Sequence, residues 1–235
     1  MKLTIIGDGT QAKKHITAIN GIGGQLVGIY DPVKYNHTEI DLVRMLDSSD
    51  WAVICSPSKY HYSQTKHILR HGVKVICEKP VSMPWEPIID DDRINVVLQY
   101  RYLDTIPDKA DNVHVTMARN AEYFKSWKGS IRNTGGIFYH LFIHYIDLAI
   151  QLNATFTGEI VPEGEQKRLI DDIDILNIDM DELYTKMYDE IVFKKNGIKT
   201  KDIRYLLWVM KKLDIMHTFT LRYKKVTMNE WVIDK

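Results

Sequence analysis

The chain has 235 residues, of which 45% are hydrophobic and 26% charged, a composition that is typical of a folded protein and excludes an extended disordered chain. Its 31 Lys and Arg balance its 31 Asp and Glu, so no overall charge favours nucleic acid or an anionic membrane as a partner. No apolar run approaches the ~18 residues of a membrane-spanning helix, and the amino end reaches a glycine too soon for a signal peptide.

The first hundred residues alternate β-rich runs with helical stretches. Strands are predicted at residues 3–6, 25–30, 51–56, 73–78 and 94–100, helices at 11–20, 41–48 and 62–70, and a short extended piece near 37–40. Several of the strands are almost continuously hydrophobic, as strands covered on both faces are. This alternation predicts an α/β fold with a parallel, doubly wound sheet.

The pattern changes after about residue 105. A strand is predicted at 112–118, an apolar helix at 137–152 after Gly135 and Gly136, two further helices at about 182–193 and 201–213, and a strand-like start of the tail at 218. We therefore predict two domains, a parallel-sheet domain over residues 1–101 and a smaller, reduced α+β domain over 102–235.

The segment IIGDGTQAKKH places Gly7, Gly9 and Ala12 in a G-x-G-x-x-A pattern between the first strand and the first helix. Gly7 would make the tight turn, Gly9 would let a pyrophosphate approach the backbone, and Ala12 would allow close packing of helix on strand. Asp31 ends the second strand, where its carboxylate could bind an adenosine ribose and would repel a 2′-phosphate. The pattern predicts NAD rather than NADP; a chance pair of turn glycines with a surface aspartate is the alternative.

Three more side chains follow the ends of predicted strands, which meet at one edge of a parallel sheet. Ser56 and Pro57 follow the third strand, and His61, which could also be only a capping or packing residue, begins the next helix. Lys79 ends the fourth strand before a proline, where the Lys-Pro bond could be cis. A partly desolvated ammonium there could have a lowered pKa and exchange protons with a hydroxyl; a solvated surface lysine is the alternative.

His140, His144 and Asp147 lie at helical spacing in the apolar segment. A site cleft, a metal site and ordinary core histidines are the three interpretations, and no third ligand has a persuasive spacing for a metal. Cys55 and Cys77 lie in apolar runs without a zinc-like spacing, so we interpret them as buried structural thiols and predict no metal. Reduced thiols fit a cytoplasmic protein, which is the compartment that we expect.

Together these motifs resemble the Gfo/Idh/MocA family of NAD(P)-dependent oxidoreductases. GDGTQAKKH, ICSPSKYHY, VICEKP, LQYRY and the GG…H…H segment occur in that family's order, and the resemblance covers about residues 1–152 well and 178–213 more loosely. It implies an amino-terminal Rossmann domain, a carboxyl-terminal domain with an open sheet, and NAD as cofactor. Within the family the chain is most similar to the branch that oxidises the 3-hydroxyl of UDP-N-acetylglucosaminuronic acid.

The resemblance also implies roles for individual residues. Lys79 and His144, with His140, would carry proton transfer. The cofactor would be held by Gly7, Gly9, Thr10, Gln11, Asp31, Ser56, Pro57, His61, Glu78, Lys79 and Gln99. The sugar nucleotide would be held by Arg101, Lys125, Ser126, Trp127, Lys128, Arg132, His140 and Tyr184, a partly cationic set that suits a uronate or a diphosphate.

The chain is shorter than usual for this family, and the stretch 153–180 looks too short for the usual sheet of the second domain. Because that sheet commonly forms a subunit interface, a homo-oligomer is an open expectation. The function expected is oxidation of a UDP-N-acetylhexosamine, or of its uronate, in nucleotide-sugar or polysaccharide biosynthesis. A dehydrogenase for another sugar or cyclic polyol, and a non-enzymatic NAD-binding or scaffold protein, are the alternatives.

Overall fold

The computed structural model describes residues 1–217 and 226–227, and the strand-like start expected at 218 lies outside them. Contacts divide the chain into two units, one formed by Met1–Tyr102 with Asp179–Arg204, the other by Leu103–Ile178 with the chain from Tyr205 onward. The division expected from the sequence, 1–101 and 102–235, groups the segment 179–204 with the second half of the chain. By its contacts this segment belongs to the first unit.

The first unit contains a five-stranded sheet in the order β2-β1-β3-β4-β5, and every neighbouring pair is parallel. Its strands are β1 (Lys2–Ile6), β2 (Gln25–Tyr30), β3 (Trp51–Ile54), β4 (Lys74–Cys77) and β5 (Ile94–Val96). Its helices are α1 (Thr10–Gly21), α2 (Glu39–Asp47), α3 (His61–Arg70) and α7 (Met180–Val192), with the 3-10 turns η1 (Ser58–Tyr60), η2 (Gln99–Tyr102) and η5 (Thr200–Ile203). The parallel α/β sheet predicted from the sequence is confirmed.

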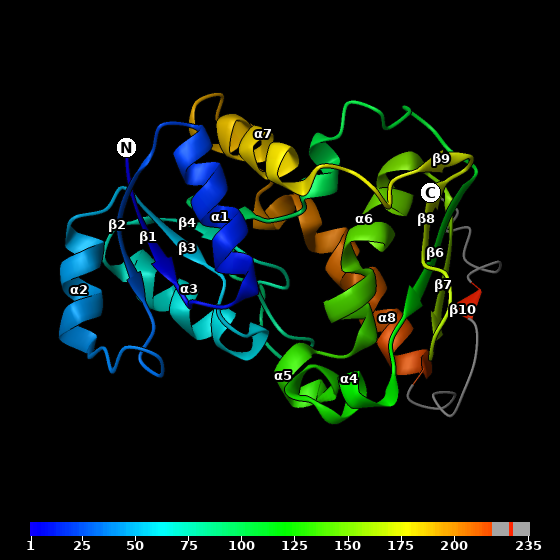
Figure 1. Cartoon of the computed structure of the whole chain (residues 1–235), viewed down its shortest axis with the longest axis horizontal. Coiled ribbons are helices and arrows are strands. Elements are labelled where there is room, and N and C mark those ends of the chain that lie inside the picture. Colours follow the sequence, from blue (N-terminus) through cyan, green and yellow to red (C-terminus); the bar gives the residue numbers. More distant parts are fainter. Residues whose placement is uncertain (218–225, 228–235) are drawn as a thin grey trace. The chain divides into compact units, whose positions relative to one another are not determined.

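Right-handed crossovers explain how helices cover this sheet. The chain moves one way from β1 to β2 and the opposite way from β2 through β3 to β4, which places α1 on one face and α2 and α3 on the other. Helix α7 packs beside α1 (Figure 1). Tyr184, Met187, Tyr188 and Ile191 of α7 are buried with Leu3 and Ile5 of the sheet in one apolar core. The helix from the second half of the chain therefore completes this layer.

Two local expectations for the first unit differ from the structure. Of the extended piece expected near 37–40, Thr38 is extended as the N-cap, whereas residues 39 and 40 already belong to α2. Thr38 forms a capping box in which its backbone N–H donates to the Asp41 carboxylate at 2.7 Å. The strand expected over 94–100 ends at Val96, and the chain then turns into η2, where the N–H of Arg101 donates to the carbonyl of Leu98.

The second unit contains a mixed sheet in the order β10-β7-β6-β8-β9 among its described residues. Its strands are β6 (Asn112–Ala118), β7 (Thr155–Val161), β8 (Lys167–Ile170), β9 (Ile173–Asp174) and β10 (Val226–Thr227). Its helices are α4 (Ala121–Lys125), α5 (Ile131–Thr134), α6 (Ile143–Leu152) and α8 (Arg204–His217), with the turns η3 (Trp127–Gly129) and η4 (Phe138–Phe142). The stretch 153–180, expected to be too short for a full sheet, supplies β7, β8 and β9.

Among the described strands of this sheet only β6 and β7 run parallel; the other neighbours are antiparallel. The chain returns from β6 to β7 through α4, α5 and α6, and α6 packs on both strands. Val113, Val115 and Met117 alternate along β6 as buried residues, which is the period of a strand with one buried face. No helix in the described part of the chain is both long and apolar enough to cross a membrane.

Candidate functional site

Gly7 forms the turn that follows β1. Its φ is +94°, and a Cβ atom at this position would lie 2.7 Å from the Cα of Ser56, which follows β3. Its N–H donates to the carbonyl of Tyr30 at 2.8 Å, so the turn is fixed between the ends of β2 and β3. Strand order reverses at β1, and such a reversal at the carboxyl ends of parallel strands is where α/β sheets bind ligands.

Gly9 and the amino end of α1 leave room for an anion. Gly9 caps the helix without a side-chain hydrogen bond, the first turn has no acidic residue, and a Cβ on Gly9 would meet no protein atom within 4 Å. The first backbone N–H groups of a helix lack partners inside the helix and favour phosphate. Thr10 is exposed beside them, and Oε1 of Gln11 is buried without a hydrogen-bond partner among the described residues. This cradle fits the pyrophosphate of a dinucleotide.

Asp31 follows β2 at the same edge of the sheet. Its Oδ2 accepts from the N–H of Asp8 at 3.0 Å, and its Oδ1 accepts from the N–H groups of Val33 and Lys34 at 3.0 and 2.9 Å. Burial acts to raise the pKa of Asp31, but these three backbone donors outweigh it and hold the pKa below its usual value. The result is a fixed anion one hydrogen bond away from the glycine turn.

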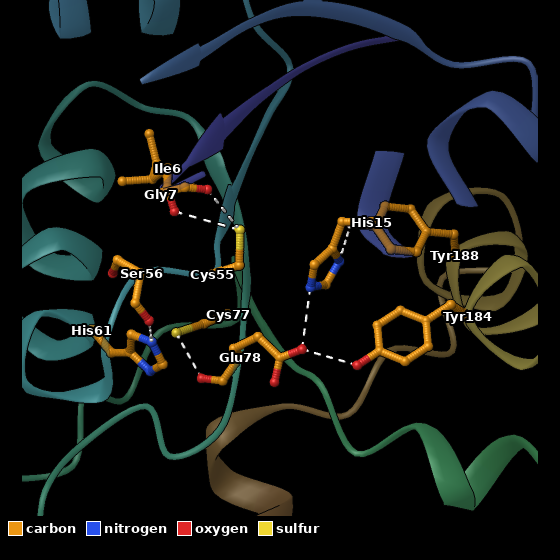
Figure 2. Close-up of polar contacts among 10 residues, drawn as sticks. All are labelled: Ile6, Gly7, His15, Cys55, Ser56, His61, Cys77, Glu78, Tyr184 and Tyr188. Carbon is orange, nitrogen blue, oxygen red and sulfur yellow. Dashed lines mark hydrogen bonds and ion pairs between the residues drawn. The ribbon is translucent and has the colours of Figure 1, made fainter. Parts of the chain in front are cut away.

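His61 lies between two loops of this edge and is only 1% exposed. Its Nε2 is 2.7 Å from the carbonyl oxygen of Ser56, and its Nδ1 is 2.7 Å from the carbonyl oxygen of Pro80 (Figure 2 shows the contact with Ser56). Carbonyl oxygens only accept, so a neutral imidazole can donate to one of them at a time. Burial lowers the pKa of His61, although both carbonyls and Glu78 act in the opposite direction.

Lys79 follows β4, and its peptide bond to Pro80 is cis, as the sequence suggested. Its side chain keeps part of its surface accessible, whereas Glu78 and Pro80 on either side are buried. Burial lowers the pKa of Lys79; the neighbouring Glu78 charge opposes this shift, and the Lys14 charge adds to it. The lysine therefore loses its proton more easily than a surface lysine does.

Glu78 lies in a buried polar network that the sequence did not reveal (Figure 2). Its Oε1 accepts from the Tyr184 hydroxyl at 2.9 Å and lies 3.2 Å from Nε2 of His15, while Nδ1 of His15 lies 2.8 Å from the Tyr188 hydroxyl. The exposed fractions are 5% for Glu78, 1% for Tyr184, and 0% for His15 and Tyr188. The hydroxyl of Tyr184, a residue expected to hold the sugar, thus donates its hydrogen bond to Glu78.

The signal that could have found His15 is its place on α1. Ala12, His15, Ala18 and Ile19 form the buried side of this helix at helical spacing, so a histidine among apolar neighbours needed polar partners inside the protein. Tyr188 of α7 and Glu78 supply these partners, one to each ring nitrogen. Gln99, in η2 at the same edge, is 5% exposed, and its Oε1 has no hydrogen-bond partner in the described part of the chain.

The residues expected to surround the sugar nucleotide lie in both units. Arg101 is a half-buried residue of η2 in the first unit. In the second unit the segment from α4 through η3 to α5 carries five more of the expected residues, all exposed: Lys125, Ser126, Trp127, Lys128 and Arg132. Trp127 is 46% exposed, and its ring lies 6.1 Å from that of His140 in an edge-to-face arrangement. One short segment, residues 125–132, therefore carries three cationic side chains and an exposed indole.

His140 and His144 do not share one regular helix. His140 belongs to η4, a single π-helical turn, and His144 to α6, which begins at Ile143. A π turn changes the angular spacing of side chains, so the common face that an α-helix would give these residues is altered. Asp147, one turn further along α6, is 1% exposed. Isolated π turns occur frequently at functional sites.

The cysteines lie in the first unit as buried thiols, which confirms the structural interpretation. Cys55 is 8% exposed and donates to the carbonyl of Gly7 at 3.2 Å; Cys77 is fully buried. Burial raises the pKa of both thiols, with the Glu78 charge adding to the shift. Among the described residues, no group of three or more histidine, cysteine or acidic side chains is placed to hold a metal ion.

A glycine turn, a helix start that no side chain caps and a strand-end carboxylate on a parallel sheet are the features of an NAD-binding Rossmann domain. Comparison with known families identifies it further. The model described as an oxidoreductase family with an NAD-binding Rossmann fold matches residues 1–90, and the model of the same family's carboxyl-terminal alpha/beta domain matches residues 110–156. The two together match more than half of the chain, which therefore belongs to the Gfo/Idh/MocA oxidoreductase family.

A curated relative is the glucose-6-phosphate 3-dehydrogenase of Bacillus subtilis (strain 168), with 24% identity over 231 residues. The match covers 81% of this chain and 65% of the relative, so the chain spans slightly less than two thirds of that protein's length.

Three solved structures share the fold. The WlbA (WbpB) dehydrogenase from Thermus thermophilus, in complex with NAD and UDP-GlcNAcA, has a TM-score of 0.73 and 19% identity, covering 91% of this chain and 94% of its own. The UDP-N-acetylglucosamine 3-dehydrogenase GnnA from Acidithiobacillus ferrooxidans has a TM-score of 0.65 and 14% identity, covering 92% and 97%. A myo-inositol dehydrogenase from Corynebacterium glutamicum ATCC 13032 has a TM-score of 0.60 and 13% identity, covering 98% and 99%. At these identities the likeness concerns the fold.

Proposed function

We propose that this protein is an NAD-dependent dehydrogenase that oxidises the 3-hydroxyl of a UDP-N-acetylhexosamine or of its uronate. The observation that carries the proposal is the position of Lys79, whose pKa is lowered by burial at the sheet edge that bears Gly7, Gly9 and Asp31. Removal of a hydroxyl proton requires a general base beside the nicotinamide, and a neutral amine can act as one.

In this proposal each half of the chain has its own part. Asp31 binds a ribose of the cofactor, and the amino end of α1 binds the diphosphate. Lys125, Lys128 and Arg132 bind the diphosphate or the uronate of the sugar through charge-assisted hydrogen bonds, and Trp127 packs against an apolar surface of the substrate. His140 and His144 share in proton transfer with Lys79.

The chemistry needs a proton acceptor and a hydride acceptor. NAD+, held by Asp31 and the amino end of α1, would supply the second, as the acceptor of the hydride from C3. Lys79, in its neutral form, accepts the proton of the 3-hydroxyl, and the product is a 3-keto sugar. Two proteins similar to this chain are also 3-dehydrogenases by name, one of glucose-6-phosphate and one of UDP-N-acetylglucosamine. Both of those substrates are anionic glucose-type rings, which supports the choice of position and charge.

The experiment supplies NAD+ with UDP-N-acetylglucosamine, its uronate, glucose-6-phosphate and myo-inositol in parallel, and follows NADH by absorbance. NADH from one of the first two, absent in Lys79→Met, is the expected result. The same sugar deuterated at C3 should give deuterated NADH, which assigns the carbon. If NADH forms only with glucose-6-phosphate or only with inositol, the proposed substrate class is wrong and the class of that compound takes its place. Tight NAD+ binding without turnover of any compound would favour the binding-only alternative.

A further inference from the structure

The buried network around Glu78 has a definite direction of donation. An ionised carboxylate only accepts, so Nε2 of His15 must carry the proton that reaches Glu78. In a neutral ring Nδ1 then accepts, and the Tyr188 hydroxyl donates to it at 2.8 Å. Burial raises the pKa of Tyr184 and of Tyr188, so both hydroxyls keep their protons and remain donors. All the contacts are therefore satisfied at once when Glu78 is charged.

Burial of a charged carboxylate lowers the stability of the fold, because the group loses several kcal/mol of hydration. A charge kept at this cost suggests a function. Two separate elements, α1 and α7, each bring a donor to the same Oε1 atom. The next residue along the chain is Lys79, and the Glu78 charge raises the pKa of that lysine against the effect of burial. The two influences thus act on Lys79 in opposite directions.

We propose that His15 and Tyr184 hold the Glu78 carboxylate as a fixed negative charge beside Lys79, which makes Glu78 a positioning residue that controls protonation of the lysine. The inference rests on the proposed role of Lys79 as proton acceptor. A base that works in both directions of a reversible oxidation must return its proton as well as take it. Burial alone favours the neutral amine, and the carboxylate restores part of the affinity for the proton.

The other ionisable groups named here as facing Glu78 add no second negative charge. His61 from α3 and Lys14 from α1 are cationic when protonated, and the Lys14 ammonium lies 5.7 Å from the centre of the Tyr184 ring. Cys55 and Cys77 have raised pKa values and stay as neutral thiols. Since none of these groups is an anion, Glu78 is the negative charge that acts on Lys79 from this group of residues.

The test measures the protonation of Lys79 directly. The purified chain is labelled with trace acetic anhydride over a range of pH, and mass spectrometry of the peptide that contains Lys79 gives the pH at which half of the amine reacts. Because neither NAD nor a sugar is needed, the outcome does not depend on whether the proposed reaction occurs. In Glu78→Gln the midpoint should fall by about one pH unit, the size expected for loss of a nearby charge. Glu39→Gln, at an exposed carboxylate of α2, is the matched control and should leave the midpoint unchanged.

Tyr184→Phe separates charge from packing, because it keeps the carboxylate and nearly the whole side-chain volume. The Lys79 midpoint should not fall in this variant, while infrared titration of the Glu78 carboxyl should move to higher pH because one donor is lost. Thermal unfolding identifies any variant that does not fold. An unchanged midpoint in folded Glu78→Gln would overturn the proposal. So would an equal fall in Tyr184→Phe, or a Glu78 titration that Tyr184→Phe leaves unmoved.

Discussion

Gly7 and Ser56 approach so closely that a single methyl group on Gly7 would lie 2.7 Å from the backbone Cα of Ser56. A backbone atom cannot turn aside as a flexible side chain can, and the φ of +94° at Gly7 disfavours any side chain. We predict that Gly7→Ala lowers the free energy of unfolding by about 2–4 kcal/mol and abolishes NAD binding. Urea denaturation and calorimetric titration with NAD+ measure the two effects.

Gly9→Ala is the control for this prediction. Its φ of −94° is allowed to alanine, and the new Cβ would meet no protein atom within 4 Å. Its stability should stay within about 0.5 kcal/mol of the parent while its affinity for NAD+ falls. Equal losses of stability in the two variants would contradict the distinction between a packing glycine and a ligand-facing glycine.

Asp31→Asn should weaken NAD binding about 10–100-fold, since a hydrogen bond to a charged group contributes about 1.5–3 kcal/mol. The variant should also have a smaller preference for NAD over NADP, because the charge that repels a 2′-phosphate is removed. Titration of both cofactors checks this. Asp50→Asn is the matched control: Asp50 also accepts a backbone N–H, that of Lys2 at 2.7 Å, but precedes β3 at the opposite edge of the sheet. A similar loss in Asp50→Asn would mean that sheet stability, not contact with the cofactor, is measured.

The rate of oxidation should rise with pH through the pKa of Lys79, because only the neutral amine accepts a proton. Burial lowers that pKa, so the rise should occur below the usual value of about 10.4 for a lysine. In Lys79→Met we expect kcat/KM to fall at least about 100-fold, with NAD affinity retained. Steady-state rates against pH measure both. A rise that persists unchanged in Lys79→Met would assign it to another group.

His61 should make the protein less stable in mild acid. Burial lowers its pKa in the folded state, so the unfolded chain binds the proton more tightly, and the free energy of unfolding falls as the pH drops below the unfolded value of about 6.5. This contribution is complete above that pH and is lost towards the folded pKa. Urea denaturation of the parent and of His61→Gln at about pH 7.5 and 5.5 isolates it. A steeper decline in the variant would show that the two carbonyl contacts favour the charged ring instead.

The fold was readable where hydrophobic pattern and turn chemistry agree. Buried strands such as Trp51–Ile54 are continuous apolar runs, and β2 begins and ends at the predicted residues because a Gly-rich turn and Asp31 bound it. The start of α2 was missed because a threonine cap resembles extended chain in sequence. The return of α7 to the first unit was missed because amphipathic periodicity shows that a helix buries one face, not what that face meets.

The residues of the candidate site also fall into those that the sequence predicts and those that it does not. Gly7, Asp31 and Lys79 are recognisable because each stands at the end of a strand, a position that sequence reports directly. The contact of Tyr184 with Glu78 joins residues 106 positions apart and leaves no local pattern. His61 was noticed as a residue at a helix start, but its contacts with two carbonyl oxygens depend on the path of both loops. Long-range polar partners are decided by packing, which single-sequence periodicity does not contain.

The return of α7 also imposes an order on biosynthesis. The edge of the first unit is completed by the chain after α7, where the carbonyl of Ile198 accepts from the N–H of Val96 at 2.8 Å and the Lys199 ammonium donates to the side chain of Asn95 at 2.7 Å. A nascent chain that has reached Tyr102 lacks this segment and the tyrosines of α7. Because β6 to β9 precede α7 in the chain, the nucleotide-binding unit can finish folding only after these strands of the second unit have been synthesised.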